Sequence, residues 1–260
     1  MIEIAIIQME IRDGAKDHNL RKVLSILKEL TFKDSPPDII CLPELFTTGY
    51  DLTSVNQLAE PLMGKTLTKI REIIIDNSCV IGTILEKNKD KFYNTAFILG
   101  KSGDILGLYR KVHLFSPMLE KEYLTAGTTI TPFIIPELQN IKVGLAICYD
   151  LRFPELFRKL TLQGAEVIFV PSEFPTPKND IWKTLLIARA IENQVFIIGT
   201  NRVGRGHSDS FFGHSMITDG DSHYILGNLP TVKTCILDFS NLEQIRKSLP
   251  LLKDRREELY

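Results

Sequence analysis

Cys148 is the residue whose position in the sequence most favours chemistry. It follows the apolar run 141–147, which is short and rich in β-branched residues, as buried strands are. Pro154, a little further on, suits the first turn of a helix, where its missing N–H costs nothing. Cys148 is therefore expected at a strand-to-helix junction, where a thiol can point out of the sheet beside free backbone N–H groups. An acyl-transfer nucleophile needs this geometry, although most free cysteines are small buried hydrophobic residues.

A nucleophilic thiol needs a base nearby, because it reacts only after losing its proton. A histidine is one option, and among the five histidines only His113 and His214 stand in contexts that could face a site. A carboxylate in a dry pocket is the other option, since desolvation raises its pKa and makes it a stronger base. Glu44 fits this second option, because it comes at the end of the mostly apolar run 38–42. The alternative for Glu44 is a carboxylate in a surface loop, or one that caps a backbone turn.

Lys111 and Glu120 supply further charges on a segment that follows another strand-like run. Lys111 lies within residues 108–115, just past the end of that predicted strand. A fixed ammonium there can hold negative charge as it builds on a carbonyl oxygen, whereas most lysines are solvated loop residues. Glu120 is an additional carboxylate on the same loop, and from sequence it could equally be solvated.

The strands and helices that would position these residues alternate along the whole chain. The predicted strands cover residues 2–8, 38–42, 79–86, 92–99, 105–109, 130–135, 141–147, 166–170, 195–200, 213–218 and 232–239. The predicted helices cover residues 19–30 and 67–77, a segment from Pro154, residues 180–193 and a last segment from Ser240 or Asn241. This alternation predicts a layered α/β fold. Some strand pairs look like hairpins, so mixed sheets are expected, with a plain doubly wound sheet as the alternative.

The composition argues against several classes of protein. The 260 residues are 44% hydrophobic, enough for a sizeable core, and 31 Lys+Arg balance 32 Asp+Glu. No basic stripe suggests nucleic acid, and no cationic amphipathic segment suggests a membrane surface. The opening residues 2–7 are too short and too strand-like for a signal or a membrane span. Four scattered cysteines without a C-x-x-C pair predict neither disulfides nor a zinc site, so free thiols in a reducing cytoplasm are expected.

Glu44, Lys111 and Cys148, in this order and with these flanks, resemble the Glu–Lys–Cys triad of the nitrilase superfamily of carbon–nitrogen hydrolases. The motifs that carry the similarity are Leu42-Pro43-Glu44-Leu45-Phe46, residues 109–115, Cys148-Tyr149-Asp150-Leu151-Arg152-Phe153-Pro154, residues 188–194, residues 213–215 and the ending 254–260. The resemblance implies one carbon–nitrogen hydrolase domain over residues 1–260, folded as a four-layer αββα sandwich with two mixed β-sheets. It also implies a homodimer that pairs through its α-faces and whose C-terminal segments interact.

Within that superfamily the chain is most similar to the omega-amidase branch, which includes 2-oxoglutaramate amidases. The cues are Thr47-Thr48-Gly49-Tyr50-Asp51-Leu52, residues 148–154, and Ser172-Glu173-Phe174-Pro175 before Trp182. The branch implies hydrolysis of a small carboxamide, the omega-amide of a 2-oxo acid such as 2-oxoglutaramate, to carboxylate and ammonia. The alternatives that use the same triad are an N-carbamoyl amino acid amidohydrolase, a deaminated glutathione amidase and a nitrilase.

The resemblance also implies roles for the residues. Glu44 would take the proton from Cys148, whose thiolate attacks the amide carbon and forms a thioester. Lys111 and the backbone N–H of Tyr149 would hold the oxyanion, and Glu120 looks like the second glutamate, which supports the lysine and the substrate amide. No metal or organic cofactor is required. His113 would belong to the scaffold, and residues 201–202 and 213–215 look structural.

The substrate-binding residues are predicted from the need to hold a free carboxylate. The candidates for a cationic or hydroxyl clamp are Tyr50, Tyr149 and Arg152, and Phe174 is the candidate for an apolar wall. Arg152 could instead pair with Asp150 or Glu155 to hold the turn, and the interpretation favours that structural role.

Two interpretations without hydrolysis stay open. One is a binding or scaffolding protein that kept the fold and lost the activity, against which the intact triad argues. The other is a redox-sensing thiol protein. A redox sensor favours a resolving cysteine nearby, and none lies close to Cys148 in the sequence.

Overall fold

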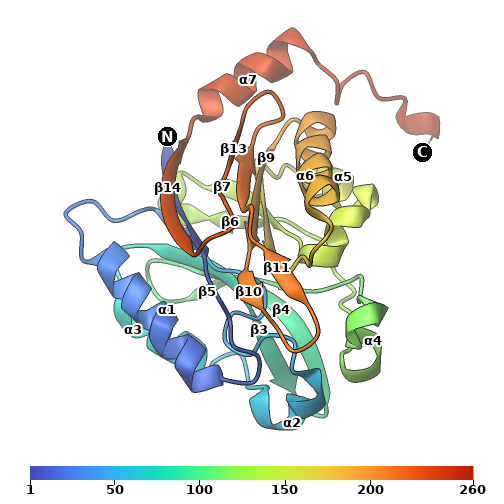
Figure 1. Ribbon diagram of the computed structural model, residues 1–260. Coiled ribbons are helices and arrows are strands. Elements are labelled where there is room, and N and C mark those ends of the chain that lie inside the picture. The colour runs from blue at the N-terminus through green and yellow to red at the C-terminus, as the bar shows by residue number, and fades with distance from the viewer. Residues whose placement is uncertain (260) are drawn as a thin grey trace.

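Two six-stranded β-sheets packed face to face form the centre of the computed structural model, which describes residues 1–259 (Figure 1). The first sheet has the order β14 (Thr231–Leu237), β1 (Ile2–Gln8), β2 (Ile39–Cys41), β3 (Cys79–Asn88), β4 (Lys91–Leu99) and β5 (Ile105–Arg110). The β1–β2 and β2–β3 pairs are parallel, and the other pairs are antiparallel. The strands from the two ends of the chain, β1 and β14, thus lie side by side in register from Ile2–Leu237 to Gln8–Thr231.

The second sheet is also mixed. Its order is β13 (His223–Ile225), β12 (Met216–Thr218), β9 (Phe196–Asn201), β8 (Val167–Ser172), β7 (Ile141–Leu145) and β6 (Phe133–Ile135). The β7–β8 and β8–β9 pairs are parallel, and the remaining pairs are antiparallel. A separate two-stranded ribbon joins β10 (Val203–Arg205) and β11 (Ser210–Phe212). The predicted mixed sheets are therefore confirmed, and the doubly wound alternative is wrong.

Helices cover the outer face of each sheet and complete the four predicted layers. Helices α1 (Lys16–Thr31) and α3 (Lys65–Ile74) lie on the first sheet, and α5 (Pro154–Leu162) and α6 (Asn179–Asn193) lie on the second (Figure 1). Helix α7 (Phe239–Ser248) follows β14, and the chain then extends away from the two sheets. Two short helices, α2 (Val55–Leu58) and α4 (Glu120–Tyr123), lie in loops.

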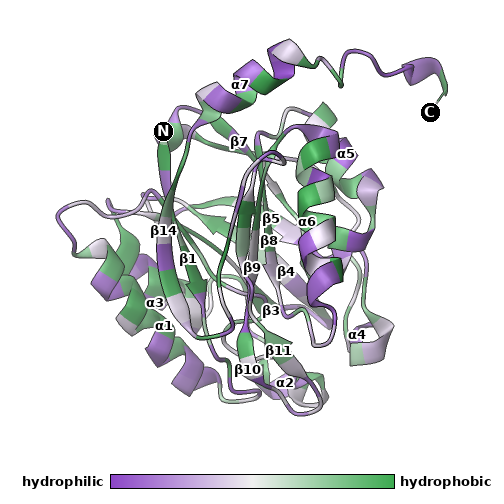
Figure 2. Ribbon diagram, turned by 45° about the horizontal axis from the view of Figure 1, so that its top comes forward, coloured by the Kyte–Doolittle hydropathy of each residue, from purple (hydrophilic) through white to green (hydrophobic). Residues whose placement is uncertain are grey.

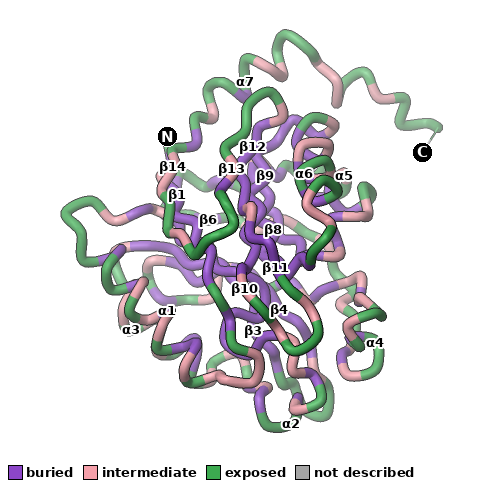
Figure 3. Tube along the Cα trace, in the orientation of Figure 1, coloured by how far each residue is buried: buried purple, intermediate pink, exposed green. Residues whose placement is uncertain are grey.

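Alternation along the strands divides the core into layers. In β1, Ile4 and Ile6 face the second sheet, whereas Ala5 and Ile7 face α1 and α3. This is the period of two that a strand buried on both faces requires. Figure 3 accordingly shows the central strands buried and the exposed positions concentrated on helices and loops, and Figure 2 shows polar residues on the outer faces of the helices.

Several element boundaries differ from their predictions. Helix α1 begins at Lys16 rather than residue 19, and β6 occupies only the end of the predicted strand 130–135. The predicted strand 213–218 is shortened to β12, because Gly213 and His214 have φ values of +72° and +54° and turn the chain. The sequence did not predict β10, β11 or β13, which are three residues long each.

Of the ending motif 254–260, the last residue, Tyr260, lies outside the described residues. Across residues 1–259, no helix is both long enough and apolar enough to span a membrane.

Candidate active site

Glu44, Lys111 and Cys148 lie on three segments that each follow a strand. Glu44 is in the turn after β2, Lys111 directly follows β5, and Cys148 begins the 3₁₀ helix η4 (Cys148–Arg152) after β7. Strands β2 and β5 belong to the first sheet and β7 to the second, so the site lies where the two sheets meet. Cys148 has a φ of +42°, and Leu45, next to Glu44, has a φ of +40°. Such left-handed values are unfavourable for residues with a Cβ and concentrate at functional sites.

Lys111 is the centre of a buried cluster of charges, called here the lysine cluster and formed by Lys111, Glu44 and Glu120. Its Nζ lies 2.8 Å from Glu44 Oε1 and 2.8 Å from Glu120 Oε1, and all three side chains are fully shielded from solvent. Two carboxylates thus share one ammonium. An ammonium in a buried site is stable only with such partners, because the unpaired charge would be strongly destabilising.

Tyr50 and Asn94 complete the hydrogen bonding of the lysine cluster. Asn94 Nδ2 donates to Oε1 of Glu44 (2.7 Å) and of Glu120 (3.2 Å). The Tyr50 hydroxyl lies 2.6 Å from Glu44 Oε1 and 3.0 Å from Glu120 Oε1, and it accepts from Lys111 Nζ at 3.1 Å. Sequence reasoning placed Tyr50 at the substrate carboxylate, whereas the structure places its hydroxyl against the two glutamates. Asn94, on β4, was missed.

Backbone N–H groups hold the outer oxygens of both carboxylates. Glu44 Oε2 accepts from Glu173 N at 2.8 Å, and Glu120 Oε2 accepts from Phe115 N at 2.6 Å. Both glutamates are therefore fixed at both oxygens. Such preorganised groups lose little entropy when a reaction proceeds through them.

Burial and charge act in opposite directions on the lysine cluster. Burial alone would lower the pKa of Lys111, but the charges of Glu120 and Glu44 outweigh it and raise that pKa above its ordinary value. Burial raises the pKa of Glu120; Lys111 opposes this shift, and the negative charge of Glu44 reinforces it. Lys111 therefore carries a proton at any physiological pH, and it is available as a positive charge.

The Cys148 thiol is protonated in the resting site. Burial is the main cause that raises its pKa, the Glu44 carboxylate raises it further, and Lys111 works in the opposite direction. A neutral thiol whose pKa responds to a neighbouring carboxylate suits proton transfer that is coupled to attack on a substrate.

Asp150 holds the turn that carries Cys148. Its Oδ2 accepts from Tyr109 OH (2.7 Å) and from Ile147 N (2.9 Å), and its Oδ1 accepts from His113 N (3.1 Å). His113 Nδ1 lies 2.7 Å from the same Oδ1, and its ring stacks on Phe153 with centroids 3.6 Å apart. The histidine thus contacts the scaffold around the thiol, which is the place expected for it.

Arg152 does not pair with Asp150 or Glu155 in the part of the chain that the structure describes, so the favoured structural role for this arginine is wrong. Its guanidinium instead lies over the Phe174 ring, 5.6 Å from the centroid. Arg152 is free to turn its charge toward a bound anion.

A small cavity opens beside Cys148. The residues that line it are Phe115, Met118, Cys148, Tyr149, Arg152, Glu173, Phe174, Pro175 and Lys178. Of the predicted substrate-binding residues, Tyr149, Arg152 and Phe174 therefore line the cavity. Tyr50 lies in a neighbouring cavity of about 120 Å³, which shares Met118 with the first. Lys178, whose Nζ lies 5.4 Å from the Phe115 centroid, adds a second cation that the sequence did not single out.

A second buried cluster of charges, called here the arginine cluster, joins Arg202, Glu173 and Asp13. Arg202 Nη1 lies 2.7 Å from Glu173 Oε2 and 2.9 Å from Asp13 Oδ1. Burial raises the pKa of Glu173 to about 8, although the Arg202 charge opposes that shift. Sequence reasoning treated Arg202 as structural and gave no role to Glu173 or Asp13.

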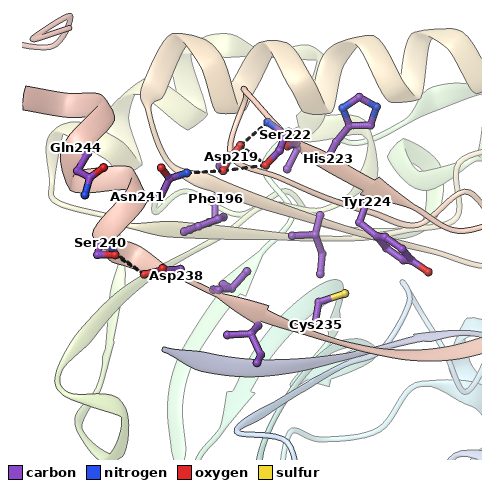
Figure 4. Close-up of a pocket in the computed structure, with 14 residues that line it drawn as sticks. Phe196, Asp219, Ser222, His223, Tyr224, Cys235, Asp238, Ser240, Asn241 and Gln244 are labelled. Carbon is purple, nitrogen blue, oxygen red and sulfur yellow. Dashed lines mark hydrogen bonds between the residues drawn. The ribbon is translucent and has the colours of Figure 1, made fainter. Parts of the chain in front are cut away.

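A larger groove, of about 560 Å³, lies elsewhere, between β13, β14 and α7 (Figure 4). Its polar side chains bond to one another: Asp219 accepts from Ser222 and Asn241, and Asp238 accepts from Ser240. Cys235 lines this groove, but the lysine cluster lies around Cys148. Residues 1–259 contain no group of three or more His, Cys, Asp or Glu side chains that could hold a metal ion.

Comparisons with known proteins show the family to which the chain belongs. Residues 3–246 match the family described as carbon–nitrogen hydrolase. The chain is 37% identical to the 2-oxoglutaramate amidase of Bacillus subtilis (strain 168), over 99% of this chain and 98% of that protein. It is 31% identical to omega-amidase NIT2 of Mus musculus, over 99% of this chain and 96% of that protein. Among solved structures, Saccharomyces cerevisiae Nit3, a member of branch 10 of the nitrilase superfamily, superposes with a TM-score of 0.88 at 26% identity, covering 98% of this chain and 96% of that one.

Proposed function

The chain belongs to the carbon–nitrogen hydrolase family and is a hydrolase of carbon–nitrogen bonds, and we propose that it uses Glu44, Lys111 and Cys148 to hydrolyse a small carboxamide through a thioester. The proposed substrate is the omega-amide of a 2-oxo acid, such as 2-oxoglutaramate. The observation that carries the proposal is the fully buried Lys111 ammonium between two carboxylates, which act together on the pKa of the buried Cys148 thiol. This combination offers a nucleophile, a base and an oxyanion partner in one dry site.

In the first step, Glu44 accepts the proton of the Cys148 thiol as the sulfur attacks the amide carbon. The S–C bond forms, and the electron pair of the carbonyl moves onto its oxygen. Transfer to Glu44 during the attack avoids a free thiolate, which the raised pKa of Cys148 disfavours.

The oxyanion that results is held by Lys111 Nζ and by the backbone N–H of Tyr149. Tyr149 is the second residue of η4, and N–H groups in the first turn of a helix have no partner within the helix. The proton on Glu44 then moves to the leaving nitrogen, the C–N bond breaks, and ammonia departs. A thioester on Cys148 remains.

A water molecule completes the cycle. Glu44 takes a proton from the water, the hydroxyl group attacks the thioester carbon, and the same two donors hold the second oxyanion. The C–S bond breaks, the proton on Glu44 returns to sulfur, and the carboxylic acid product leaves and releases its proton to solvent. Glu120, Tyr50 and Asn94 would support these steps by holding Lys111 and Glu44 in place.

The acidic end of the substrate is proposed to bind Arg152 and Lys178. Both line the cavity beside Cys148, and both lie against an aromatic face instead of an acidic side chain. The names of the relatives at 37% and 31% identity, a 2-oxoglutaramate amidase and an omega-amidase, support a substrate with an amide at one end.

Ammonia release from a panel of substrates tests the proposal. The panel contains 2-oxoglutaramate, 2-oxosuccinamate, deaminated glutathione, glutamine, an N-carbamoyl amino acid and an aliphatic nitrile. We expect the highest kcat/KM for a 2-oxo acid amide and a thioester adduct on Cys148 in the mass spectrum of quenched enzyme. A higher kcat/KM for the N-carbamoyl amino acid, deaminated glutathione or the nitrile would support the corresponding alternative function. No turnover of any of these substrates would contradict the proposed activity.

The carboxylate clamp has its own test. Arg152→Met and Lys178→Met should each raise KM for 2-oxoglutaramate about tenfold, the typical value of one charged hydrogen bond. Hydrolysis of uncharged propionamide serves as the control and should change little. An equal loss with both substrates would show that these residues act on the fold or on the chemistry instead.

We further propose a homodimer and a cytoplasmic location. Leu162, Ile181 and Ile191 are exposed on α5 and α6, and exposed apolar side chains of this kind favour an interface. The four free cysteines suit a reducing compartment. Sedimentation at micromolar concentration tests the first point, and a monomer would contradict it.

A further inference from the structure

The two carboxylate oxygens of Glu44 have different surroundings. Oε1 accepts from Lys111 Nζ and Asn94 Nδ2 and contacts the Tyr50 hydroxyl. Among the described residues, Oε2 accepts one backbone hydrogen bond, from the N–H of Glu173 at 2.8 Å. Each oxygen offers two lone pairs, so Oε2 is the oxygen with room for the proton of Cys148. The Glu173 N–H then fixes the direction in which that oxygen faces.

The end of β9 holds the backbone of Glu173, whose N–H binds Glu44. Asn201 and Arg202 follow each other where β9 ends. Asn201 Oδ1 accepts from Phe174 N (2.8 Å), and Asn201 Nδ2 donates to Phe174 O (3.2 Å). Arg202 N donates to Ser172 O (3.2 Å), and Arg202 Nη1 donates to Glu173 Oε2 (2.7 Å). Ser172, Glu173 and Phe174 are thus all hydrogen-bonded to the two residues at the end of β9.

Arg202 is itself anchored from several sides. Its Nη1 donates to Asp13 Oδ1 (2.9 Å), and its Nη2 donates to the carbonyl oxygens of Ile11 and Arg205. The guanidinium carbon lies 4.3 Å from the centroid of Phe211, and the arginine is completely buried. A planar guanidinium can make these directed contacts at once, whereas a lysine ammonium acts as a single point charge.

We propose that Arg202, Glu173 and Asp13 are positioning residues for the general base, because they hold the Glu173 peptide so that its N–H aims Glu44 Oε2 at Cys148. This inference rests on the proposed function, in which Glu44 is the base. The arginine cluster acts through Glu44 and needs no contact with the substrate.

The charge state of Glu173 adds a second effect to this role. The pKa of Glu173 is raised to about 8 by burial; Arg202 opposes the shift, and Asp13 and Glu44 reinforce it. Glu173 is therefore neutral in most molecules below pH 8. Ionisation above that pH adds a negative charge to this buried site, and that charge opposes the negative charge that builds on the substrate oxygen during the attack.

Other charged or titratable groups face the same place. Cys148, Arg152 and Lys178 line the cavity together with Glu173. The two cations lie over the aromatic rings of Phe174 and Phe115 on the substrate side of the cavity. The resting Cys148 thiol stays protonated near pH 8, because its own pKa is raised. We therefore expect kcat to fall as the pH rises through about 8.

Arg202→Lys tests the positioning role. This variant keeps the positive charge and loses the fork of donors, so the Glu173 peptide shifts. We expect kcat to fall about 10- to 100-fold, the effect of a misplacement on the order of 1 Å, with KM within about twofold. The rate at which iodoacetamide alkylates Cys148 should fall in parallel, because it also depends on Glu44.

Arg246→Lys is the matched control. Arg246 is a half-buried arginine that donates twice to the carbonyl of Gln194 and lies on α7, away from the site. It should change the melting temperature but leave kcat and the alkylation rate unchanged. An Arg202→Lys enzyme with wild-type kcat, or with a raised KM alone, would overturn the positioning role.

Glu173→Gln tests the charge and does not depend on Arg202→Lys folding. The amide keeps an oxygen for Arg202 and removes the ionisation. We expect kcat of this variant to stay constant from pH 6.5 to pH 8.5, whereas kcat of the wild type falls over the same range. A fall that persists in Glu173→Gln, or is missing from the wild type, would overturn the charge effect. Wild-type enzyme that releases no ammonia from any amide would instead contradict the proposed function.

Discussion

The lysine cluster and the arginine cluster are built alike and differ in one respect. Each places two carboxylates around one buried cation, and a single hydrogen bond, from Glu173 N to Glu44 Oε2, connects the two. The ammonium of Lys111 is a compact charge whose neighbours are side chains. The guanidinium of Arg202 also binds backbone carbonyls of distant segments.

This difference indicates a division of work. A point charge can turn toward a new negative charge on a substrate, whereas a planar fork that is committed to several acceptors holds its surroundings in one arrangement. The lysine cluster is thus suited to the reaction, and the arginine cluster to the geometry that the reaction needs. Substitutions that act on the two clusters separately can break or refine this distinction.

The largest effect is expected for Cys148→Ala, which removes the nucleophile and leaves both clusters intact. Turnover should fall by at least about 10⁴-fold, as in other enzymes that lose a covalent nucleophile. Ammonia release at high enzyme concentration measures it, and the melting temperature should stay near that of the wild type. Near wild-type turnover would contradict the division of work between the two clusters, because the reaction would then not proceed through a thioester on Cys148.

Lys111→Met should have the next largest effect. The variant loses an oxyanion donor, which costs about 10²- to 10³-fold in kcat, and it leaves two buried carboxylates unpaired, which destabilises a fold by about 3–5 kcal/mol. Urea unfolding and ammonia release measure the two losses. Arg202→Lys should lower kcat less than Lys111→Met does. The reverse order would mean that the arginine cluster takes part in the chemistry.

A smaller effect is expected for Tyr50→Phe. The hydroxyl contacts Glu44, Glu120 and Lys111, and the loss of one such hydrogen bond typically costs about 1 kcal/mol, or roughly fivefold to tenfold in kcat. Tyr224→Phe is the matched control, because Tyr224 lines the distant groove in Figure 4. Equal kinetics for the two variants would argue against a role for Tyr50 in the lysine cluster.

The smallest effect concerns stability and pH. The pKa of Glu173 is about 8 in the folded protein against an ordinary value of 4.5, so its neutral form is favoured by folding. The stability from this group is present below pH 4.5 and is lost as the pH rises to about 8. Glu173→Gln lacks this loss, so its free energy of unfolding relative to wild type should increase between pH 5 and pH 8.5.

Urea unfolding at the two pH values measures that difference. Glu29→Gln, an exposed carboxylate on α1, is the control and should follow the wild type at both. Lys111 contributes no slope in this range, because its pKa is raised from a value that already lies above it. A constant difference between Glu173→Gln and wild type would show that Glu173 is ionised throughout.

The resemblance to the nitrilase superfamily predicted the two mixed sheets and the meeting of Glu44, Lys111 and Cys148, and each of these three residues follows a strand-like run. Glu173 follows the strand-like run 166–170 in the same way, so the rule that selected Glu44 would have selected it too. Asn94 gave no such signal, since a single small polar residue inside the run 92–99 looks like an ordinary strand position. Only the packing of β4 against the site reveals that its amide meets two carboxylates.

The wrong partner for Arg152 has a physical cause as well. Proximity in sequence favoured Asp150, but the carboxylate of Asp150 is already occupied by Tyr109, His113 and the backbone N–H of Ile147. Those donors come from distant segments that a sequence cannot place. Asp150 therefore has no acceptor oxygen left for Arg152, and the arginine lies over the Phe174 ring instead.

The pairing of β1 with β14 has a consequence for how the protein is made. Residues 2–8 leave the ribosome long before their partner on one side, residues 231–237. During translation, one edge of β1 therefore stays unpaired and can join strands of other chains. Because contacts between remote segments also slow folding, production of this protein should improve when chaperones are abundant.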